Sequence, residues 1–567
     1  MTLALAHRGP DARCAKIVGD RHSLGGARLH ITGIASAPFP YRREDERQQV
    51  LLNGEIYNFR QWQKMLADEG HIFTTGTDTE VVWALYRKHG TKFVQELKGM
   101  FAIAILDGDK VILARDPFGI KPLYYYRKGR QLAFASEIKS LLRFIEKQPR
   151  LHVSALQEII TFGFICSRDS TLFEEIQQVK PGEILVFDGE NCYTETYYTP
   201  LPAFSILNKK VGYREQRLQL LSLLRKSMEV ILHHDDQEKG VFLSGGIDSS
   251  LMAVLGKEVS GNLKTFTIAD DPQAPDLPWS RRVAQAIGSD HYEFKVTFAD
   301  YLLELPSYVY HYENIVSGGV FDLQGGMAFH LLCKQASQYV KVALTGEGAD
   351  ELFGGYYWTY THPLGFADRI RRRLQQATQH VSGPELESLV NRLFPLPENK
   401  TLYRLNAFDF LLQGGLSNYH LWSVDRSSGA FGFEIRPFYL YDDIVGLGLN
   451  TPVEHKVPSN NVTKLILKDV ARHYFSPYGL EDVPTRKKYG MPAALSQVNS
   501  QLQHYINQRV TDSYFEKHPY RHFLHTKTDL VMFDLFYYIY FHGKGIFDPE
   551  FNLGEALAGG IFEDMYH

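Results

Sequence analysis

Residues 244–250 place two glycines and a carboxylate directly after an apolar run, in an order that suits phosphate binding. The segment reads Ser-Gly-Gly-Ile-Asp-Ser-Ser, and the apolar residues 240–243 before it predict a buried strand. Glycines leave backbone N–H groups open to an anion, and a helix expected from Ser249 adds its positive N-terminal dipole. Asp248 offers a carboxylate that could hold Mg²⁺ beside phosphates. The segment is not a Walker A loop, because the Gly-Lys-Ser/Thr ending is missing.

A second segment, residues 345–356, repeats this combination further along the chain. It follows another apolar strand, residues 340–344, and contains four glycines together with the carboxylates of Glu347, Asp350 and Glu351. Ligands of parallel sheets bind at the carboxyl ends of strands, so both loops are expected at one edge of a sheet. A plain glycine turn explains either segment alone. Two such loops in one chain favour a nucleotide site.

The composition is that of an ordinary soluble globular protein. With 567 residues the chain is too long for one core, so two domains are expected. The net charge of −4 argues against nucleic acid as the main partner, and the basic cluster at residues 369–373 reads as a solvated helix face. Four scattered cysteines without a CxxC pair argue against a disulfide scaffold or zinc site. The sequence shows neither a signal peptide nor a membrane span, so we expect a cytoplasmic protein without membrane contact.

The elements that position these loops follow from hydrophobic periodicity. Up to about residue 195 short strands with turn signals predict two sheets packed face to face with helices outside. From about residue 213 strands alternate with helices, which predicts a parallel sheet, and after Tyr356 the chain reads as mainly helical with an aromatic end that fills core. Strands are expected at residues 49–53, 101–106, 110–114, 131–135, 183–187, 240–243, 263–268 and 340–344, and helices at 59–69 and 79–89.

These patterns together carry a resemblance to a known family. The loop at residues 244–250 resembles the PP-loop of ATP pyrophosphatases, which cleave ATP to AMP and pyrophosphate while adenylating a substrate. The first half resembles class II glutamine amidotransferases, and the whole chain is similar to asparagine synthetases. The matching segments of the first half are residues 7–11, 26–29, 52–58, 76–80, 99–102, 115–124 and 135–137.

The resemblance implies a two-domain α/β fold. Residues 1–198 would form an N-terminal α-β-β-α sandwich of the Ntn-hydrolase type, truncated at its first strand. Residues 199–212 would be a linker, and residues 213–567 a parallel α/β PP-loop domain with a helical C-terminal part. The implied ligands are ATP, Mg²⁺, glutamine or ammonia, and a carboxylate acceptor, either aspartate or a larger acid. The resemblance leaves open whether the protein forms a homodimer.

For glutamine, the resemblance implies a site that pairs with both charged ends of a free amino acid. Arg28 would bind the α-carboxylate through two nitrogens. Glu55 and Asp78 would receive the α-ammonium. The side chain of Asn53 and the backbone N–H of Gly54 would form the oxyanion hole. Ordinary loop charges are the alternative, and the five matching positions favour the site.

The nucleophile is where the sequence departs from the family. Relatives use a cysteine exposed at the mature N-terminus, whose own α-amine acts as general base. Here the chain begins with Met1 and Thr2, its first cysteine, Cys14, is internal, and neither Thr2 nor Cys14 is expected to substitute. We expect poor or no glutamine hydrolysis from this polypeptide. Either the native protein starts upstream, which the intact glutamine residues favour, or the domain survives as a scaffold.

For ATP, the resemblance implies contacts from both loops. Phe242 and Ile268 would flank the adenine through their backbone groups. Thr345 and Gly346 would touch the nucleotide from the second loop. The residues expected around the phosphates are Ser244, Gly245, Gly246, Asp248 and Ser249.

The chemical steps are expected to depend on charged residues near these loops. Asp248 with Asp350 would bind Mg²⁺. Glu347 would handle a proton during amide formation, and Lys488, in a basic segment, would neutralise the departing pyrophosphate. Lys464 also matches a family segment and reads as structural.

The acceptor pocket matches the family least well. Residues 312–326 contain four glycines with Val316, Val320 and Phe321, and no arginine to pair with a second carboxylate. A larger or less acidic acceptor and a harmless loop variant both explain this pattern.

Three functions therefore compete. The leading hypothesis is ATP-dependent, glutamine-hydrolysing amide formation of the asparagine synthetase type. The alternative is an amide ligase of the same fold that uses no glutamine, as β-lactam synthetases and lasso-peptide cyclases do. A non-catalytic protein would need broken ATP loops, whereas both loops are intact in the sequence.

Overall fold

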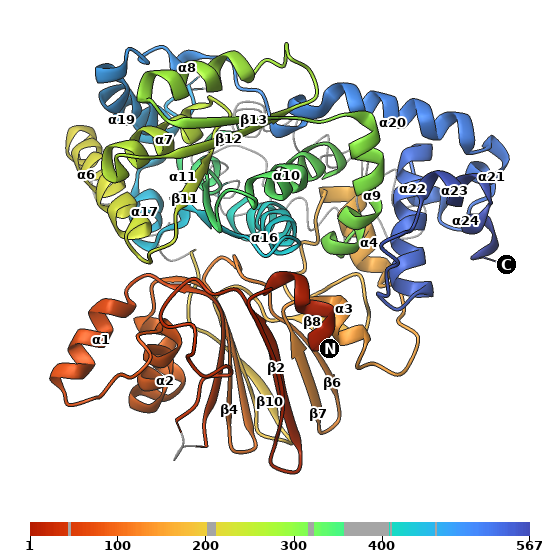
Figure 1. The fold of residues 1–567 in the computed structure, drawn as a ribbon, viewed down its shortest axis with the longest axis horizontal. Helices are drawn as coiled ribbons and strands as arrows, with labels where there is room; N and C mark the ends of the chain where they lie inside the picture. Colours follow the sequence, from red (N-terminus) through yellow and green to blue (C-terminus); the bar gives the residue numbers. More distant parts are fainter. Residues whose placement is uncertain are drawn as a thin grey trace, which may run out of the picture.

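The computed structural model describes residues 1–43, 47–200, 211–315, 322–356, 408, 411–459 and 462–566. A β-rich N-terminal domain lies against a larger C-terminal α/β domain, and short helices gather near the C-terminus (Figure 1). The predicted two-domain architecture is confirmed. Residues 201–210 of the predicted linker and the basic cluster at 369–373 lie outside the described residues.

The described part of the N-terminal domain is built from antiparallel strands. A five-stranded sheet has the order β10-β9-β5-β4-β3, a three-stranded sheet the order β7-β6-β8, and β1 and β2 form a hairpin. The strands and helices predicted here are found within a few residues. The elements are η1 (Thr2–Arg8), β1 (Ala12–Val18), β2 (His22–Arg28), β3 (Gln49–Ile56), α1 (Phe59–Asp68), α2 (Asp78–His89), η2 (Gly90–Glu96), β4 (Gly99–Asp107), β5 (Lys110–Arg115), β6 (Tyr124–Lys128), β7 (Gln131–Ala135), α3 (Ile138–Leu142), α4 (Val153–Phe162), β8 (Ile176–Gln178), β9 (Glu183–Phe187) and β10 (Cys192–Thr196).

Strand β4 explains why this domain forms layers. Phe101 and Ile103 share a core with Trp83 of α2, whereas Ala102 and Ala104 pack with residues of β6 and β7. Because successive side chains of a strand point to opposite faces, a strand covered on both faces must be apolar throughout. The helices, the five-stranded sheet and the second sheet are therefore stacked in this order.

The C-terminal domain alternates strands and helices before it becomes helical. Its first part contains α6 (Tyr213–Leu232), β11 (Lys239–Phe242), α7 (Ile247–Ser260), β12 (Lys264–Ala269), α8 (Leu277–Ile287), β13 (Asp290–Lys295), α9 (Phe298–Tyr312), α10 (Asp322–Ala336), β14 (Val342–Thr345) and α11 (Ala349–Phe353). The described later elements are η3 (Leu411–His420), α16 (Leu421–Gly429), β15 (Glu434–Pro437), η4 (Phe438–Leu440), α17 (Asp442–Asn450), α18 (Val453–Lys456), α19 (Leu465–Phe475), η5 (Ser476–Tyr478), η6 (Val483–Thr485), η7 (Met491–Leu495), α20 (Ser496–Arg509), α21 (Asp512–Lys517), η8 (Arg521–Phe523), α22 (Lys527–Tyr537), η9 (Tyr538–His542), α23 (Leu553–Ala558) and α24 (Ile561–Asp564).

The sheet of this domain is parallel, with the order β13-β12-β11-β14-β15. The chain winds outward from β11 through β12 to β13 and then returns to place β14 on the other side of β11. The loops that follow β11 and β14 therefore meet where the direction of winding reverses. Open α/β sheets bind ligands at this point.

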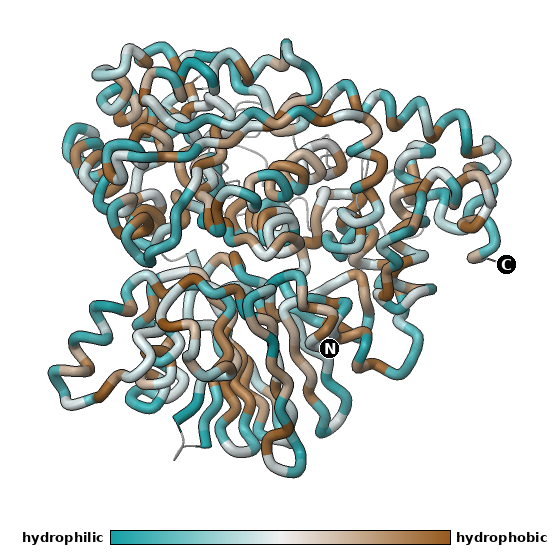
Figure 2. The backbone as a smooth tube through the Cα atoms, viewed as in Figure 1, coloured by the Kyte–Doolittle hydropathy of each residue, from teal (hydrophilic) through white to brown (hydrophobic). Residues whose placement is uncertain are grey.

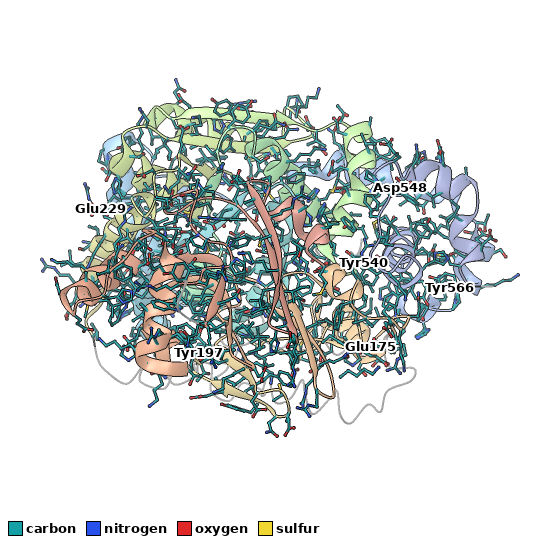
Figure 3. All side chains as sticks on the ribbon, turned by 60° about the horizontal axis from the view of Figure 1, so that its bottom comes forward. Glu175, Tyr197, Glu229, Tyr540, Asp548 and Tyr566 are labelled. Atoms are coloured by element: carbon teal, nitrogen blue, oxygen red, sulfur yellow. The ribbon has the colours of Figure 1, made fainter. Side chains whose placement is uncertain are left out.

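The aromatic residues near the C-terminus fill core, as predicted. Phe533, Phe536 and Tyr540 are fully buried, and Figure 3 labels Tyr540 among them. Phe541 stacks on Phe173 of the N-terminal domain with ring centroids 5.0 Å apart. Hydrophobic residues also run along the strands of the N-terminal domain, while the outer loops are mostly hydrophilic (Figure 2). All four cysteines are unpaired. Within the described ranges, no helix combines the length and apolar character that crossing a bilayer requires.

Buried ion pairs join the two domains. Two nitrogens of Arg8 donate to Asp425, each at 2.8 Å, and one also donates to Glu137 at 3.0 Å. Arg426 extends the network to Glu313 at 2.7 Å. Arg8, the most exposed side chain of this group, is only 11% exposed. Charges buried to this extent are stable only when paired, so the network fixes how the domains meet.

Replacing Arg8 by methionine tests this contact. Arg8→Met removes a positive charge that compensates the buried carboxylates of Asp425 and Glu137. Removing one partner of a buried ion pair lowers the free energy of unfolding by about 3–5 kcal/mol. We expect a clearly lower midpoint of thermal unfolding in scanning calorimetry. Arg13→Met, at an exposed position of β1, is the matched control and should change stability by no more than about 0.5 kcal/mol. Equal midpoints for the two variants would contradict the proposed role of the network.

Candidate active sites

The first glycine-rich loop lies between β11 and α7, and the helix begins two residues earlier than expected. Gly245 has a φ of 71°, and a Cβ there would lie 2.5 Å from Cβ of Trp279, so only glycine fits. The hydroxyl of Ser244 accepts from the N–H of Gly246 at 3.3 Å, and the hydroxyl of Ser249 donates to the Gly246 carbonyl at 3.2 Å. These bonds fix the loop at a helix N-terminus, where anions bind well.

The second loop lies beside the first, at the ends of neighbouring strands. Thr345 ends β14, and a Cβ on the following Gly346 would lie 3.3 Å from Cβ of Asp248 in the first loop. Phe242 ends β11 and Ile268 lies near the end of β12, and their side chains are buried in the core. Only the backbone groups of these two residues are left to contact a ligand. The structure thus brings the predicted nucleotide residues together.

Two carboxylates from these loops converge on Lys464. Its Nζ lies 2.7 Å from Asp248 and 2.7 Å from Asp350, and Lys488 donates to Asp350 at 2.6 Å. Burial alone would raise the pKa of Asp350, but Lys464 and Lys488 outweigh burial and hold this pKa below its usual range. Lys464 is 3% exposed and has a φ of 52°, a backbone conformation that costs energy for residues other than glycine. The sequence analysis read this lysine as structural, because nothing near it in the sequence connects it to the loops.

The carboxylate pair fits magnesium by the type of its donor atoms. Asp248 and Asp350 converge on one cation, and carboxylate oxygens are the ligands that Mg²⁺ prefers. The ammonium group of Lys464 compensates both charges. Either residue could therefore hold Mg²⁺ that arrives with a nucleotide.

Glu347 lies in the second loop next to these charges. It accepts a hydrogen bond from the hydroxyl of Thr345. Burial raises the pKa of Glu347, and the negative charges of Asp350 and Asp248 raise it further. A carboxyl group whose pKa lies closer to neutral exchanges a proton more readily with a reacting amine. The geometry is therefore compatible with the proton-handling role predicted for Glu347.

The residues predicted to bind glutamine also lie together. Arg28 at the end of β2, Gly54 and Glu55 on β3, and Asp78 at the start of α2 line a cavity of about 70 Å³. Thr77 caps α2 by accepting a backbone N–H from the first turn, which fixes the position of Asp78. The cavity thus contains one cation and two carboxyl groups, the set that a free amino acid needs.

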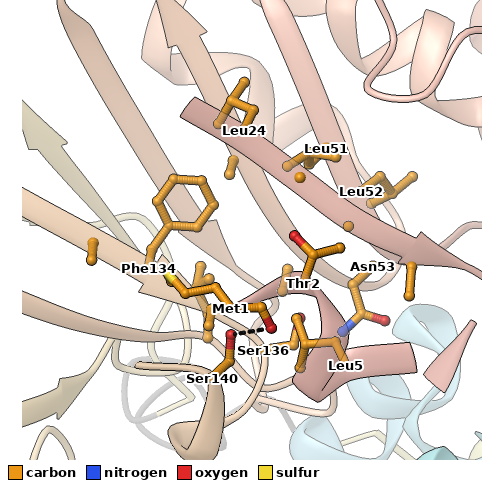
Figure 4. Close-up of a pocket in the computed structure, with 18 of the residues that line it drawn as sticks. Met1, Thr2, Leu5, Leu24, Leu51, Leu52, Asn53, Phe134, Ser136 and Ser140 are labelled. Carbon is orange, nitrogen blue, oxygen red and sulfur yellow. Dashed lines mark hydrogen bonds between the residues drawn. The ribbon is translucent and has the colours of Figure 1, made fainter. Parts of the chain in front are cut away.

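Asn53 lines a larger cavity of about 950 Å³ (Figure 4). Arg28, Gly54 and Glu55 line both cavities, so the two adjoin. Nδ2 of Asn53 is buried and has no hydrogen-bond partner within the described part of the chain. Gly54 has a φ of 123°, and a Cβ there would lie 1.9 Å from the carbonyl oxygen of Met100, so glycine is required. An amide donor without an acceptor, beside this glycine, is compatible with an oxyanion hole.

The pKa values of the two carboxyl groups of the small cavity are shifted in opposite directions. Glu55 accepts from the hydroxyl of Thr32 and from Nε2 of His234, both at 2.6 Å. Burial would raise the pKa of Glu55, but His234, Arg436 and Thr32 outweigh burial and lower it. Burial raises the pKa of Asp78 well above its ordinary value, and the charge of Glu55 adds to this shift. An ammonium group bound between the two would favour ionisation of both. The sequence analysis did not identify His234.

The residues considered for the nucleophile and the acceptor site are placed as follows. Cys14 lies on β1 opposite Gly26 and lines neither cavity, whereas Thr2 begins η1 and lines the larger one (Figure 4). The acceptor segment, residues 312–326, is described only in part. Residues 316–321 of this segment, which include Val316, Val320 and Phe321, lie outside the described residues. That they line the acceptor pocket stays a prediction.

Comparisons with known proteins match both halves of the chain. Residues 1–198 match the family model described as a glutamine amidotransferase domain, and residues 219–534 match that described as asparagine synthase. Asparagine synthetase [glutamine-hydrolyzing] 1 of Bacillus subtilis is 29% identical, over 91% of this chain and 88% of its own. The putative asparagine synthetase [glutamine-hydrolyzing] 2 of Methanocaldococcus jannaschii is 28% identical, over 75% and 86%. Amidase chry2 of Gibberella zeae is 31% identical, over 62% and 54%.

Removing the charge of Lys464 tests the carboxylate pair. In Lys464→Met, Asp248 and Asp350 lose the cation between them, so we expect a loss of stability of about 3–5 kcal/mol. Millimolar Mg²⁺ should restore part of this loss, because it replaces the missing charge. Scanning calorimetry with and without MgCl₂ measures both effects, and Lys226→Met, at an exposed position of α6, is the control. A Lys464→Met protein that is as stable as wild type and does not respond to Mg²⁺ would refute this account.

Proposed function

Because this chain belongs to the asparagine synthase family and is an ATP-dependent carbon–nitrogen ligase, we propose that it converts aspartate to asparagine, with glutamine or ammonia as the nitrogen source. One observation carries the proposal. Two glycine-rich loops, together with Asp248, Asp350 and Glu347, meet where the winding of a parallel sheet reverses. This arrangement can hold a triphosphate beside an acid–base group.

The proposed reaction has two steps. A carboxylate oxygen of the acceptor attacks the α-phosphorus of ATP, and pyrophosphate leaves as the acyl-adenylate forms. Ammonia then attacks the acyl carbon, and AMP leaves with the oxygen that came from the acceptor. The N–H groups of the loop at residues 244–249 bind phosphate, Lys488 offsets the charge of the leaving pyrophosphate, and Glu347 accepts a proton from the attacking amine. Mg²⁺ held by Asp248 and Asp350 would neutralise phosphate charge.

The N-terminal domain is proposed to bind glutamine. Arg28 would pair with its α-carboxylate, Glu55 and Asp78 with its ammonium, and Asn53 with Gly54 would stabilise the oxyanion. Among the described residues that line the two cavities there is no cysteine. We therefore infer that this polypeptide hydrolyses glutamine poorly and that ammonium is its effective nitrogen source.

A second candidate function keeps the ATP chemistry and changes the acceptor. Residues 312–326 contain no arginine to pair with the second carboxylate of aspartate. An amide ligase of the same fold that takes a larger or less acidic carboxylate, and no glutamine, would have the same ATP site. The two candidates differ in which acid triggers release of pyrophosphate and in whether glutamine supplies nitrogen.

Pyrophosphate release with ATP and Mg²⁺ tests the proposal. With aspartate and ammonium we expect pyrophosphate and asparagine in equal amounts, and with glutamine in place of ammonium much less asparagine. No aspartate-dependent pyrophosphate from either nitrogen source would overturn the asparagine assignment and favour another acceptor. Asparagine formed equally well from glutamine would overturn only the inference about the impaired glutaminase step.

Replacing Glu347 separates chemistry from binding. In Glu347→Gln the side chain keeps its size but cannot accept the proton, so we expect kcat for asparagine formation to fall by about 10²–10⁴. The KM for ATP should change little, because the loops that bind phosphate are intact. Glu454→Gln, at an exposed position of α18, is the control. A Glu347→Gln enzyme with the kcat of wild type would exclude an acid–base role for this residue.

A further inference from the structure

His234 belongs to the C-terminal domain and contacts Glu55, which lines the pocket proposed for glutamine. It follows α6 and precedes β11, and its side chain is 1% exposed. Its Nε2 lies 2.6 Å from Oε2 of Glu55. One carboxylate oxygen of Glu55, one of Asp78 and one ring nitrogen of His234 all lie within 4.8 Å of one another. One imidazole from the second domain therefore reaches the carboxyl groups that would bind the ammonium of glutamine.

Packing fixes the orientation of this imidazole. The rings of Tyr57 and Phe59 contact it edge-on, each with centroids 5.3 Å away. The next residue, Asp235, pairs with Arg436 at 2.8 Å and with Lys239 at 2.9 Å, which anchors the backbone. A histidine that is buried, held between two rings and anchored on one side has little freedom to turn away from Glu55.

The hydrogen bond has a defined direction. Glu55 has a lowered pKa and is ionised at neutral pH, so its oxygen can only accept and Nε2 of His234 must donate. The hydroxyl of Thr32 donates to the same oxygen at 2.6 Å. The titratable and charged groups that face Glu55 are His234, Arg436, Asp78, Glu434, Lys239 and Tyr57.

We propose that His234 is a positioning residue for glutamine: it holds the Glu55 carboxylate where Glu55, together with Asp78, receives the α-ammonium of the substrate. Glutamine binding by the N-terminal domain then depends on a side chain of the C-terminal domain. The inference rests on the proposed function, since it assigns glutamine to this pocket.

Three variants test the role of His234 by titration calorimetry with L-glutamine from acidic to neutral pH, because the lowered pKa of Glu55 places its protonation at acidic pH. His234→Leu removes the donor, and His234→Gln keeps an amide donor on a chain of similar reach. His233→Leu changes the adjacent, exposed histidine and is the matched control. Pyrophosphate release with ammonium is measured in parallel, because it reports on the ATP site without requiring glutamine.

We expect His234→Leu to weaken glutamine binding roughly tenfold or more, the size expected for one hydrogen bond to a charged group. Without this donor the Glu55 carboxyl holds its proton to a higher pH, so the pH below which binding weakens should move upward. His234→Gln should recover most of the affinity and the wild-type pH profile. His233→Leu should match wild type, and the ammonium-dependent activity of every variant should be preserved.

Other outcomes separate the inference from the proposed function. Unchanged glutamine affinity and pH profile in His234→Leu would overturn the role of His234 alone. If both His234 variants lose glutamine binding and also lose ammonium-dependent activity, the proposed role of His234 is overturned as well. The residue would then be needed for folding. Absence of glutamine binding to the wild-type protein would overturn the glutamine site itself, and the inference with it.

Discussion

Opposite charges that are buried together hold the sites of this protein and its two domains in place. A charge removed from water is costly unless a partner and hydrogen bonds compensate it. Arg8 meets Asp425 where the domains touch, and Lys464 meets Asp248 and Asp350 at the ATP loops. Each group joins segments that are far apart in the sequence. The positions of the reactive side chains therefore depend on the pairing of buried opposite charges as much as on the path of the chain.

Strand β11 connects the two pockets covalently. His234 lies just before it and contacts Glu55, and Ser244 begins the ATP loop just after it. The strand is hydrogen-bonded to a neighbour on each side, β12 and β14, so it cannot shift without them. The pocket proposed for glutamine and the loops proposed for ATP are thus connected through one hydrogen-bonded strand.

Sequence patterns predicted the parts of this structure that depend on neighbouring residues. The apolar runs of β4, β11 and β14 and the glycines that follow the last two identified the sheets and both loops. Lys464 was read as structural and His234 was not identified, because the importance of both residues arises only when remote segments meet. The hairpin β1–β2 was not among the expected strands, since most of its residues are partly or fully exposed and show little apolar alternation.

The central claim is that an acyl-adenylate precedes the amide, and the fate of oxygen tests it most directly. Aspartate labelled with ¹⁸O in its side-chain carboxylate is incubated with the protein, ATP, Mg²⁺ and ammonium, and the products are analysed by mass spectrometry. The account predicts label in AMP, because the oxygen that attacks the α-phosphorus leaves with it when the amide forms. Label in inorganic phosphate, accompanied by ADP, would indicate an acyl phosphate instead and would contradict the account.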